Sequence, residues 1–387
     1  MKNNKRIPPD DLDEIIPMLI SIWRRFHKLP GPEDRLQTRE FRSVVAAVIA
    51  LQERHGAGNV VKEYDYFDDR ELVGAYLLYD WILHYMQGLS LINELPTTPK
   101  RVLDVCSGPG AFGFAAMRHG AEEVIALDRN RLALDLAGEA FGRYGYTLTA
   151  RKWNAQRRSL DIEGKFDLII VGHALEELFP SDEKGWQEEQ YRFLNDLLSR
   201  LTDNGYLLLV ENSQLSSNQR ILVLRDHYVK EGVPVQAPCV WRGECPALKA
   251  KKSPCYAQRE FERPYLIREI QRAARIKQSS LKMSYLILRN PQAAWPKLPE
   301  RPMYRVISPA VQGIDSDRYY LCGTNGKKML ESKITDDTKT ARAFGYLKRG
   351  ELIAVDNVQK DEGRFVLTKD SILTVEAALG KPLPEVG

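Results

Sequence analysis

The chain has 387 residues, of which 43% are hydrophobic and 28% are charged, and its formal net charge is +4. The composition is that of a globular protein with a real core, and the length favours two or three domains of about 100–200 residues each. It excludes a membrane-spanning helix, because no apolar run reaches about 18 residues. The N-terminus carries no secretory or transit signature, so we expect a cytoplasmic protein whose five cysteines are not in disulfides.

Residues 1–97 are predicted to form a helical domain, because apolar side chains recur at helical spacing in residues 12–23 and in two later stretches. Residues 98–225 then alternate short Val/Ile/Leu-rich runs with amphipathic segments. This alternation predicts an α/β fold with a parallel, doubly wound, Rossmann-like sheet. The expected strands are 101–107, 122–128, 147–153, 166–172 and 206–212, and the expected helices are 112–119, 131–144 and 186–201.

The rest of the chain divides into three parts by composition. Residues 226–290 form a basic segment that contains three cysteines and ends in the strand-like run SYLILRN. Residues 291–302 are a proline-rich linker. Residues 303–387 contain five short strand-like runs, which predict a small β-rich domain.

A glycine-rich turn follows the first predicted strand, in RVLDVCSGPGAFGFAA. Gly108, Gly110 and Gly113 spell G-x-G-x-x-G, which is a weak sign of a nucleotide cofactor when it stands alone. Gly108 and Gly110 let the backbone approach a cofactor closely. Asp104 ends the strand, where a carboxylate can organise the ammonium group of S-adenosylmethionine (SAM). Asp128 ends the next strand, where it can bind the ribose hydroxyls of either SAM or NAD.

The stretch DVCSGPGA resembles the D-x-G-x-G-P-G loop of class I SAM-dependent methyltransferases, with Cys106 in place of the first glycine. The resemblance favours SAM over NAD or a purely structural turn. By topology, Asn154 is expected near the adenine, and Gly172 and His173 are expected where the substrate meets the methyl group. No Asn/Asp-Pro-Pro-Tyr run and no cysteine nucleophile stands there, so no catalytic residue is predicted.

The basic segment favours a local anion-binding surface. Residues 241–289 hold twelve Lys or Arg and four acids, whereas the rest of the chain is slightly acidic. Nucleic acid is the commonest partner of such a surface, and a solvated helix face is the alternative. On a helix, Arg268, Arg272 and Arg275 would share one face and meet successive phosphates. The predicted RNA-binding residues are Arg259, Arg263, Arg268, Arg272, Arg275, Lys251 and Lys252.

Four cysteines outside the glycine loop form a possible ligand set. Cys239, Cys245 and Cys255 have the spacing C-x5-C-x9-C, and Cys322 lies far downstream. Four thiolates can bind a tetrahedral zinc ion or a cubane iron–sulfur cluster. Structural zinc sites usually show tighter C-x2–4-C pairs, whereas wide spacing with flanking prolines suits a loop around a larger cluster. From the spacing, zinc, iron–sulfur and incidental buried cysteines all stay open.

The segment APCVWRGECPALKAKKSPCYAQREFERP resembles the methyltransferase-like assembly factors of the small ribosomal subunit, which occur in mitochondria and as bacterial homologues. Also similar are AYLLYDWILHYMQGLSLINELP, DLIIVGHALEEL and SYLILR. One departure is ENSQLSS after the fifth strand, where the family tends to have a Glu-Pro-Gly-type loop. The resemblance implies binding to small-subunit rRNA in assembly intermediates. It also implies a [4Fe–4S] cluster on Cys239, Cys245, Cys255 and Cys322.

The leading prediction is therefore a monomeric, cytoplasmic, SAM-binding rRNA methyltransferase that carries a [4Fe–4S] cluster and acts in ribosome assembly or translation, without membrane contact. The alternative is a non-catalytic RNA-binding assembly factor that uses the same fold as a platform. A zinc-stabilised methyltransferase is the alternative for the metal. Radical SAM chemistry is not favoured, because its usual C-x3-C-x2-C loop and barrel are absent from the sequence.

Overall fold

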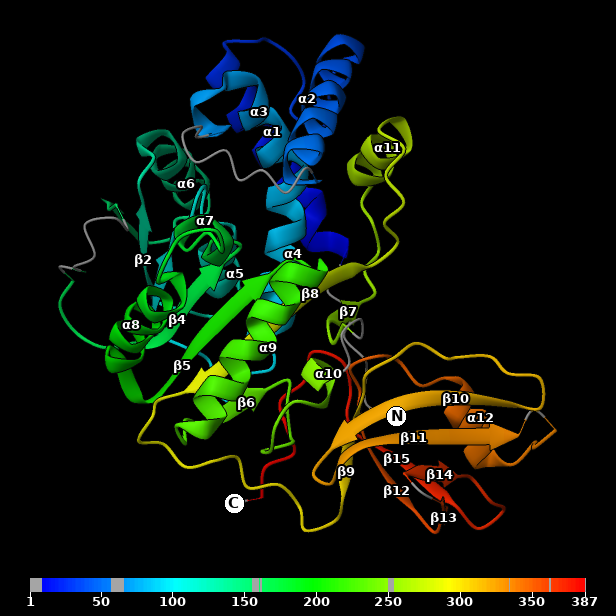
Figure 1. Cartoon of the computed structure of the whole chain (residues 1–387). Helices are drawn as coiled ribbons and strands as arrows, with labels where there is room; N and C mark the ends of the chain where they lie inside the picture. The colour runs from blue at the N-terminus through cyan, green and yellow to red at the C-terminus, as the bar shows by residue number, and fades with distance from the viewer. Residues whose placement is uncertain are drawn as a thin grey trace. The chain divides into compact units, whose positions relative to one another are not determined.

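The described elements of residues 9–92 are helices, helices and strands alternate from residue 101 to residue 289, and strands dominate the last quarter of the chain (Figure 1). The structure is a computed structural model and describes residues 9–56, 66–154, 160, 162–249, 254–333, 335–361 and 363–386. The chain divides into two compact units. Unit 1 comprises Met1–Ile92, Thr98–Thr202 and Glu260–Leu281, and unit 2 comprises Asn93–Thr97, Asp203–Arg259 and Lys282–Gly387. In this division four strands of the first sheet group with the tail of the chain.

The helices predicted near the N-terminus are present in unit 1. They are α1 (Pro9–His27), α2 (Thr38–Gly56), η1 (Tyr66–Asp68), α3 (Arg70–Ala75), η2 (Tyr76–Asp80) and α4 (Trp81–Ile92). Asp69 caps α3, because its carboxylate accepts the N–H groups of Glu71 and Leu72. The buried pair Arg24 and Glu40 joins α1 to α2, with Nε and Oε1 2.9 Å apart. Between α3 and α4, η2 is a π-helical turn, which the apolar periodicity did not predict.

Unit 1 also contains four parallel strands in the order β3-β2-β1-β4. The strands are β1 (Arg101–Val105), β2 (Glu123–Asp128), β3 (Leu148–Lys152) and β4 (Phe166–Gly172). The helices that follow are α5 (Ala111–Arg118), α6 (Arg131–Arg143), α7 (Leu175–Leu178), α8 (Trp186–Ser199) and α11 (Tyr265–Ala273). Val, Ile and Leu in β1, β2 and β4 are fully buried, as in parallel sheets covered on both faces. The predicted parallel α/β arrangement is confirmed.

The strands of unit 2 that belong to the first sheet run in the order β5-β8-β6, and β8 is antiparallel to both neighbours. The elements are β5 (Leu201–Glu211), α9 (Leu215–Lys230), β6 (Val235–Ala237), α10 (Pro246–Lys249), β7 (Ala257–Arg259) and β8 (Leu281–Arg289). The long helix α9 was not predicted. Its side chains contact the cysteine-bearing segment, as described below.

A second, seven-stranded sheet of unit 2 has the order β13-β14-β11-β10-β9-β12-β15 (Figure 1). Its elements are β9 (Met303–Val306), β10 (Ser316–Gly323), β11 (Gly326–Lys333), α12 (Lys339–Gly345), β12 (Leu352–Asp356), β13 (Gln359–Asp361), β14 (Arg364–Val366) and β15 (Ile372–Ala377). Tyr304, Tyr319 and Leu330 lie in its core. In this sheet Cys322 pairs with Arg305 on β9 and Lys327 on β11. Among the described residues, no helix has the length and apolar character needed to cross a membrane.

Candidate functional site

The loop between β1 and α5 turns through three residues in the left-handed conformation. Cys106, Gly108 and Gly110 have φ angles of +57°, +51° and +76°. Glycine adopts such angles without strain, whereas Cys106 does so at a cost. A Cβ on Gly110 would lie only 3.1 Å from the Cβ of Ala137, so a side chain there would press on α6. The loop therefore requires glycine at position 110, both for its φ angle and for its close packing against α6.

Asp104 and Asp128 stand at the carboxyl ends of the neighbouring strands β1 and β2, and both hold the glycine loop. Asp104 Oδ2 accepts the N–H of Gly113 at 2.8 Å. Asp128 accepts the N–H of Gly108 at 2.8 Å through Oδ2 and that of Asn130 at 2.8 Å through Oδ1. The structure thus brings together the two acids that the sequence predicted for the cofactor ammonium and ribose.

The surroundings of Asp104 disfavour its negatively charged form. The side chain is 1% exposed, and burial raises the pKa of Asp104 to about 7, with a smaller effect from the charge of Asp128. Burial also raises the pKa of Cys106 well above its usual value, so this cysteine is a neutral thiol rather than a nucleophilic thiolate. A cation placed beside Asp104 would favour its carboxylate form.

The π-helical turn η2 places Tyr76 over the glycine loop. The Tyr76 hydroxyl lies 3.4 Å from the position that a Cβ on Gly108 would take. Burial raises the pKa of Tyr76 well above its usual value, and nearby acids including Asp80 add to the shift, so the hydroxyl stays protonated. Trp81, at the start of α4, donates its indole N–H to the carbonyl of Pro109 at 3.0 Å. Single π turns within helices often mark functional sites.

A pair of stacked histidines lies at the end of β4. His173 follows Gly172 with a left-handed φ of +55°, and its Nε2 lies 2.8 Å from Oε1 of Gln87. The ring stacks on His84, with centroids 4.2 Å apart and planes 18° apart. His84 Nδ1 in turn lies 3.3 Å from the Tyr76 hydroxyl. The sequence predicted His173 but missed His84 and Gln87, because α4 has the apolar pattern of an ordinary core helix.

Asn154, predicted to lie near the adenine, is half-buried two residues beyond β3. The N–H of Trp153 donates to the carbonyl of Asp128 at 2.8 Å, which holds this turn beside the end of β2. The predicted cofactor positions after β1, β2, β3 and β4 therefore share the carboxyl edge of one parallel sheet, where ligands of such folds bind.

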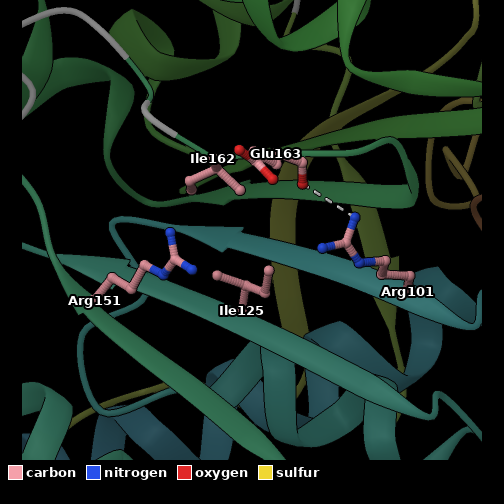
Figure 2. Close-up of a pocket in the computed structure, with 5 residues that line it drawn as sticks. All are labelled: Arg101, Ile125, Arg151, Ile162 and Glu163. Carbon is pink, nitrogen blue, oxygen red and sulfur yellow. Dashed lines mark hydrogen bonds between the residues drawn. The ribbon is translucent and has the colours of Figure 1, made fainter.

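A hollow of about 460 Å³ lies elsewhere on unit 1. Figure 2 shows its lining residues, Arg101, Ile125, Arg151, Ile162 and Glu163. Arg101 begins β1, and its guanidinium donates to the carbonyl of Glu163 at 3.2 Å. None of the predicted cofactor residues lines this hollow, so we assign it no part in cofactor binding.

The four cysteines outside the glycine loop lie near one another in unit 2. Burial raises the pKa of Cys322, and the thiols of Cys239, Cys255 and Cys245 raise it further. Burial, together with the thiols of Cys239 and Cys245, raises the pKa of Cys255 to about 12. In the part of the chain that the structure describes, no three His, Cys, Asp or Glu side chains form a group that could hold a single metal ion. A tetrahedral zinc site would need its sulfur atoms about 3.8 Å apart.

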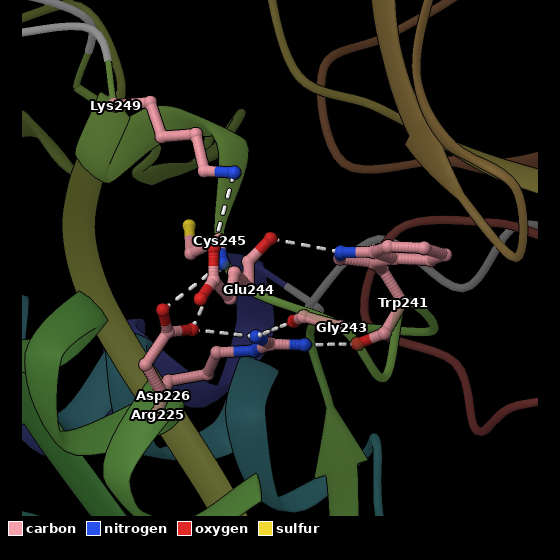
Figure 3. A network of polar contacts seen from close by, with 7 residues as sticks. All are labelled: Arg225, Asp226, Trp241, Gly243, Glu244, Cys245 and Lys249. Carbon is pink, nitrogen blue, oxygen red and sulfur yellow. Dashed lines mark hydrogen bonds and ion pairs between the residues drawn. The ribbon is translucent and has the colours of Figure 1, made fainter. Parts of the chain in front are cut away.

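Helix α9 holds the loop around Cys245 through two adjacent charged residues (Figure 3). Arg225 is 1% exposed, and its guanidinium donates to the carbonyls of Trp241 and Gly243. Arg225 also pairs with Asp226 at 2.6 Å. Both carboxylate oxygens of Asp226 lie 3.0 Å from the backbone nitrogen of Cys245, which donates to them. This network fixes the backbone of one predicted metal ligand.

Two arginines from the tail of unit 2 hold the backbone beside two other thiols. Arg305 donates from Nε to the carbonyl of Pro238 at 3.0 Å, and Arg349 donates from Nη2 to that of Pro254 at 3.2 Å. These prolines directly precede the first and third cysteines of the segment.

The guanidinium of Arg225 on α9 also lies close to the thiols. Burial alone would lower the pKa of Arg225, but Cys239 and the carboxylate of Asp226 raise it, so a buried positive charge lies beside the thiols.

Arg259 does not belong to the predicted RNA surface. It is 5% exposed and forms a buried ion pair with Glu94, whose other oxygen accepts the hydroxyl of Tyr285 at 2.7 Å. A guanidinium held in this way is not available to RNA, so the prediction for this residue is withdrawn. Lys251 and Lys252 lie outside the described residues.

The other predicted RNA-binding residues lie on or beside α11 in unit 1. Arg268 and Arg272 are exposed on the helix, and Arg263 is half-buried before it. The helix ends at Ala273, so Arg275 does not lie on it as expected. Instead Arg275 is exposed just beyond the helix, with a left-handed φ of +57°.

Comparison with known proteins places this geometry in a family. Residues 89–349 match the family described as mitochondrial small ribosomal subunit Rsm22. The chain is 38% identical over 80 residues to ribosomal protein L11 methyltransferase of Symbiobacterium thermophilum, which is 21% of this chain and 25% of that protein. It is 29% identical over 134 residues to the same enzyme of Geobacter sulfurreducens, covering 35% and 36% of the two chains. The chain thus spans about a quarter to a third of the length of these relatives.

Among solved structures, a putative RNA methyltransferase from Pyrococcus horikoshii is similar at 16% identity and a TM-score of 0.34, covering 53% of this chain and 82% of that one. The N-methyltransferase NodS from Bradyrhizobium japonicum, in complex with S-adenosylhomocysteine, is similar at 13% identity and a TM-score of 0.35. That match covers 54% of this chain and 85% of the other.

Proposed function

Because this chain belongs to the mitochondrial small ribosomal subunit Rsm22 family, we propose that it binds SAM and a [4Fe–4S] cluster and acts on small-subunit rRNA during ribosome assembly. The observation that carries the proposal is the pairing of Asp104 and Asp128 with the N–H groups of the glycine loop. A loop held by acids at two adjacent strand ends is suited to a cofactor that carries both an ammonium and a ribose.

The residues at this edge fit SAM by their chemistry. The buried carboxyl of Asp104 would pair with the methionine ammonium, and Asp128 retains lone pairs for the ribose hydroxyls. Asn154 would meet the adenine amine. Bound SAM supplies a methyl group that is open to nucleophilic attack. Gly172 and His173 stand at the end of β4, where the acceptor would approach.

We propose methyl transfer to rRNA as the first version of this function. The ring of His173 lies with Nε2 2.8 Å from Gln87 Oε1, and a neutral imidazole has one basic nitrogen. A basic nitrogen beside the acceptor would take up a proton released on methylation. The second version is a non-catalytic assembly factor, which the absence of a recognisable catalytic motif in the sequence supports.

The two versions of the proposed function can be distinguished with small-subunit particles from cells that lack this protein. Incubation with the protein and tritiated SAM should label their rRNA, and Asp128→Ala should abolish both the label and the binding of SAM measured by calorimetry. If the protein binds the particles and SAM but transfers no label, the enzyme version fails and the platform version stands. If calorimetry detects no SAM binding by the wild-type protein, the cofactor proposal fails as a whole.

The thiol set of unit 2 fits a cluster better than a single zinc ion. The other three cysteines all raise the pKa of Cys322, yet the described residues contain no single-ion site. A cubane cluster is larger than one ion, so its ligands lie farther apart. Cys239, Cys245, Cys255 and Cys322 would bind its four iron atoms, and the cluster would join β10 to the segment before β7.

Anaerobic purification followed by iron, sulfide and zinc analysis tests the metal. We expect about four iron atoms and four sulfides per chain, with the brown colour of a cluster. Cys322→Ser should lower the iron content and bleach the colour, whereas Cys106→Ser, a matched change in the glycine loop, should leave both unchanged. One zinc and no iron would overturn the cluster proposal. Unchanged iron in the Cys322 variant would show that the fourth ligand is misassigned.

A further inference from the structure

An exposed tyrosine stands among arginines on helix α11 of unit 1. Tyr265 is the first residue of the helix and is 71% exposed, which is unusual for a large aromatic side chain. Arg268 and Arg272 follow at helical spacing, so the three side chains share one face. The opposite face, with Leu266 and Ile267, is buried. The helix therefore has a packed apolar face and presents an aromatic ring and two guanidinium groups to solvent.

These side chains border an open hollow of about 560 Å³. Its lining includes five basic side chains, among them Arg275 and Lys277, and one carboxylate, Glu269, which pairs with Arg272. Among the described residues, Arg268 and Arg275 form no ion pair. The hollow is within the volume range of pockets that bind small ligands and has a strongly positive lining. It is suited to an anion that also has a flat apolar surface.

Hydrogen bonds connect the less exposed residues that line this hollow. Gln271 is 2% exposed and accepts a hydrogen bond from Arg263 Nη1 at 3.0 Å. Its amide nitrogen lies 3.2 Å from the hydroxyl of Tyr79, which it donates to. Arg263 also donates to the carbonyl of Gln278 at 3.4 Å. Arg263 therefore helps to position α11, whereas the exposed arginines can contact a ligand.

The turn after α11 brings more positive charge to the same place. The N–H of Ile276 donates to the carbonyl of Gln271 at 2.9 Å, and Arg275 between them adopts the left-handed conformation. This turn folds the chain back at the helix end. As a result, basic groups from the helix and from the turn line one hollow, with Tyr265 at its edge.

We infer that this hollow binds an unpaired nucleotide of single-stranded RNA, with the base stacked on Tyr265 and the flanking phosphates at Arg268, Arg272 and Arg275. Every base has a π-face that can stack on an exposed aromatic ring, and basic side chains that follow the backbone complete such sites. Duplex RNA conceals its base faces and offers only groove edges, 2′-hydroxyls and phosphates. The inference rests on the RNA binding proposed above and specifies that the bound RNA is a loop or a single strand.

Fluorescence anisotropy with the full chain tests this inference. The probes are a labelled RNA of about ten nucleotides and the same RNA annealed to its complement, measured at about 50 and 200 mM salt. We expect the single strand to bind more tightly than the duplex. Tyr265→Ala should weaken binding of the single strand roughly 5- to 150-fold and leave duplex binding unchanged, whereas Tyr265→Phe should retain the affinity. Tyr346→Ala, at another tyrosine that is 81% exposed, is the matched control and should have no effect.

Arginine variants distinguish the contribution of phosphate contacts to RNA binding from that of base stacking. Arg268→Ala should weaken single-strand and duplex binding alike and reduce the salt slope by about one. If this variant weakens binding but Tyr265→Ala does not, the stacking site is refuted while RNA binding stands. If the wild-type chain binds neither RNA, or if only an acidic peptide such as polyglutamate binds, both this inference and the proposed RNA binding are refuted. Thermal melting curves that match wild type confirm that each variant is folded.

Discussion

The side chain of Asn218 forms two hydrogen bonds with the backbone of Cys255. Its Nδ2 donates to the cysteine carbonyl at 2.8 Å, and the cysteine N–H donates to its Oδ1 at 3.1 Å. Asn218 is 1% exposed in the first turn of α9, and Asp226 on the same helix holds the N–H of Cys245. One helix therefore fixes the backbone at two of the four thiols.

Asn218→Ala should loosen Cys255 and lower the amount of iron that the chain retains. The change leaves a partly buried N–H and a partly buried carbonyl without this partner, which costs about 1–3 kcal/mol of stability. Iron content and thermal melting measure the two effects. Asn204→Ala, at an exposed asparagine of β5, is the control and should change neither. Full iron content in the Asn218 variant would show that the helix does not organise the thiols.

Two glycine substitutions should have opposite effects on stability. A Cβ on Gly113 would lie 2.9 Å from Cγ1 of Val124 and 3.0 Å from Oδ2 of Asp104, so Gly113→Ala should destabilise the fold by about 1–3 kcal/mol and weaken SAM binding. A Cβ on Gly138, in α6, would meet nothing within 4 Å. Gly138→Ala should therefore stabilise the protein by about 0.5–1 kcal/mol. Denaturant unfolding and calorimetry with SAM check both; equal effects would contradict the packing described.

Asp104 should make the stability of the ligand-free protein fall as pH rises. Its pKa in the folded state is about 7, above the ordinary value of 3.8, so the folded state binds the proton more tightly than the unfolded state does. The stability contributed by this group is full below about pH 4 and is lost as pH rises through 7, by up to about 4 kcal/mol. Asp104→Asn removes this dependence.

The melting temperature of the Asp104→Asn variant, relative to wild type, should therefore rise between pH 4 and 7 and level off above that range. SAM binding to the wild-type protein should strengthen over the same range, because a cation favours the carboxylate, and it should release a proton below pH 7. Calorimetry in buffers of different ionisation enthalpy detects that proton. Parallel melting profiles of the two proteins would contradict the assigned pKa.

His173 offers a test of backbone strain that is separate from its side-chain chemistry. Its φ of +55° is tolerated by Asn but not by a β-branched residue. We expect His173→Asn to keep nearly wild-type stability and His173→Val to lose about 1–3 kcal/mol more. In the enzyme version both variants should lose methyl transfer, and the Asn variant should still bind S-adenosylhomocysteine. Equal melting temperatures of the two variants would argue against strain at this position.

The sequence was sufficient for features that depend on neighbouring residues. The neighbouring positions of Asp104 and Asp128 could be predicted because each lies at the end of a short apolar strand, and the ends of parallel strands meet at one edge. The glycine loop could be located because left-handed turns select a few residue types. The π-helical turn at Tyr76 could not be predicted, because one extra residue in a helical turn leaves the apolar pattern almost unchanged.

Contacts between segments that are far apart in the sequence could not be predicted, for a different reason. Arg259 lies in a basic segment, so the local charge predicted that it belongs to the RNA surface. In the structure it is buried in an ion pair with Glu94, which lies 165 residues earlier in the sequence. The residues that hold the thiol loop, such as Asn218 and Arg225, precede it on a helix that the sequence did not reveal. Arg305 and Arg349 follow it in the tail. Nothing in local spacing or charge indicates which of many arginines will pack against a given loop.

The position of Cys322 on β10 has a consequence for the order of events during synthesis. It follows Cys255 by 67 residues, so at about 5–20 residues per second the ribosome makes it roughly 3 to 13 seconds after the other three thiols. During that interval the loop before β7 has only three of its four proposed ligands. A chain that stops short of β10 never acquires the fourth. The proposed cluster could thus be completed only in a polypeptide whose tail has been translated and has begun to pair its strands.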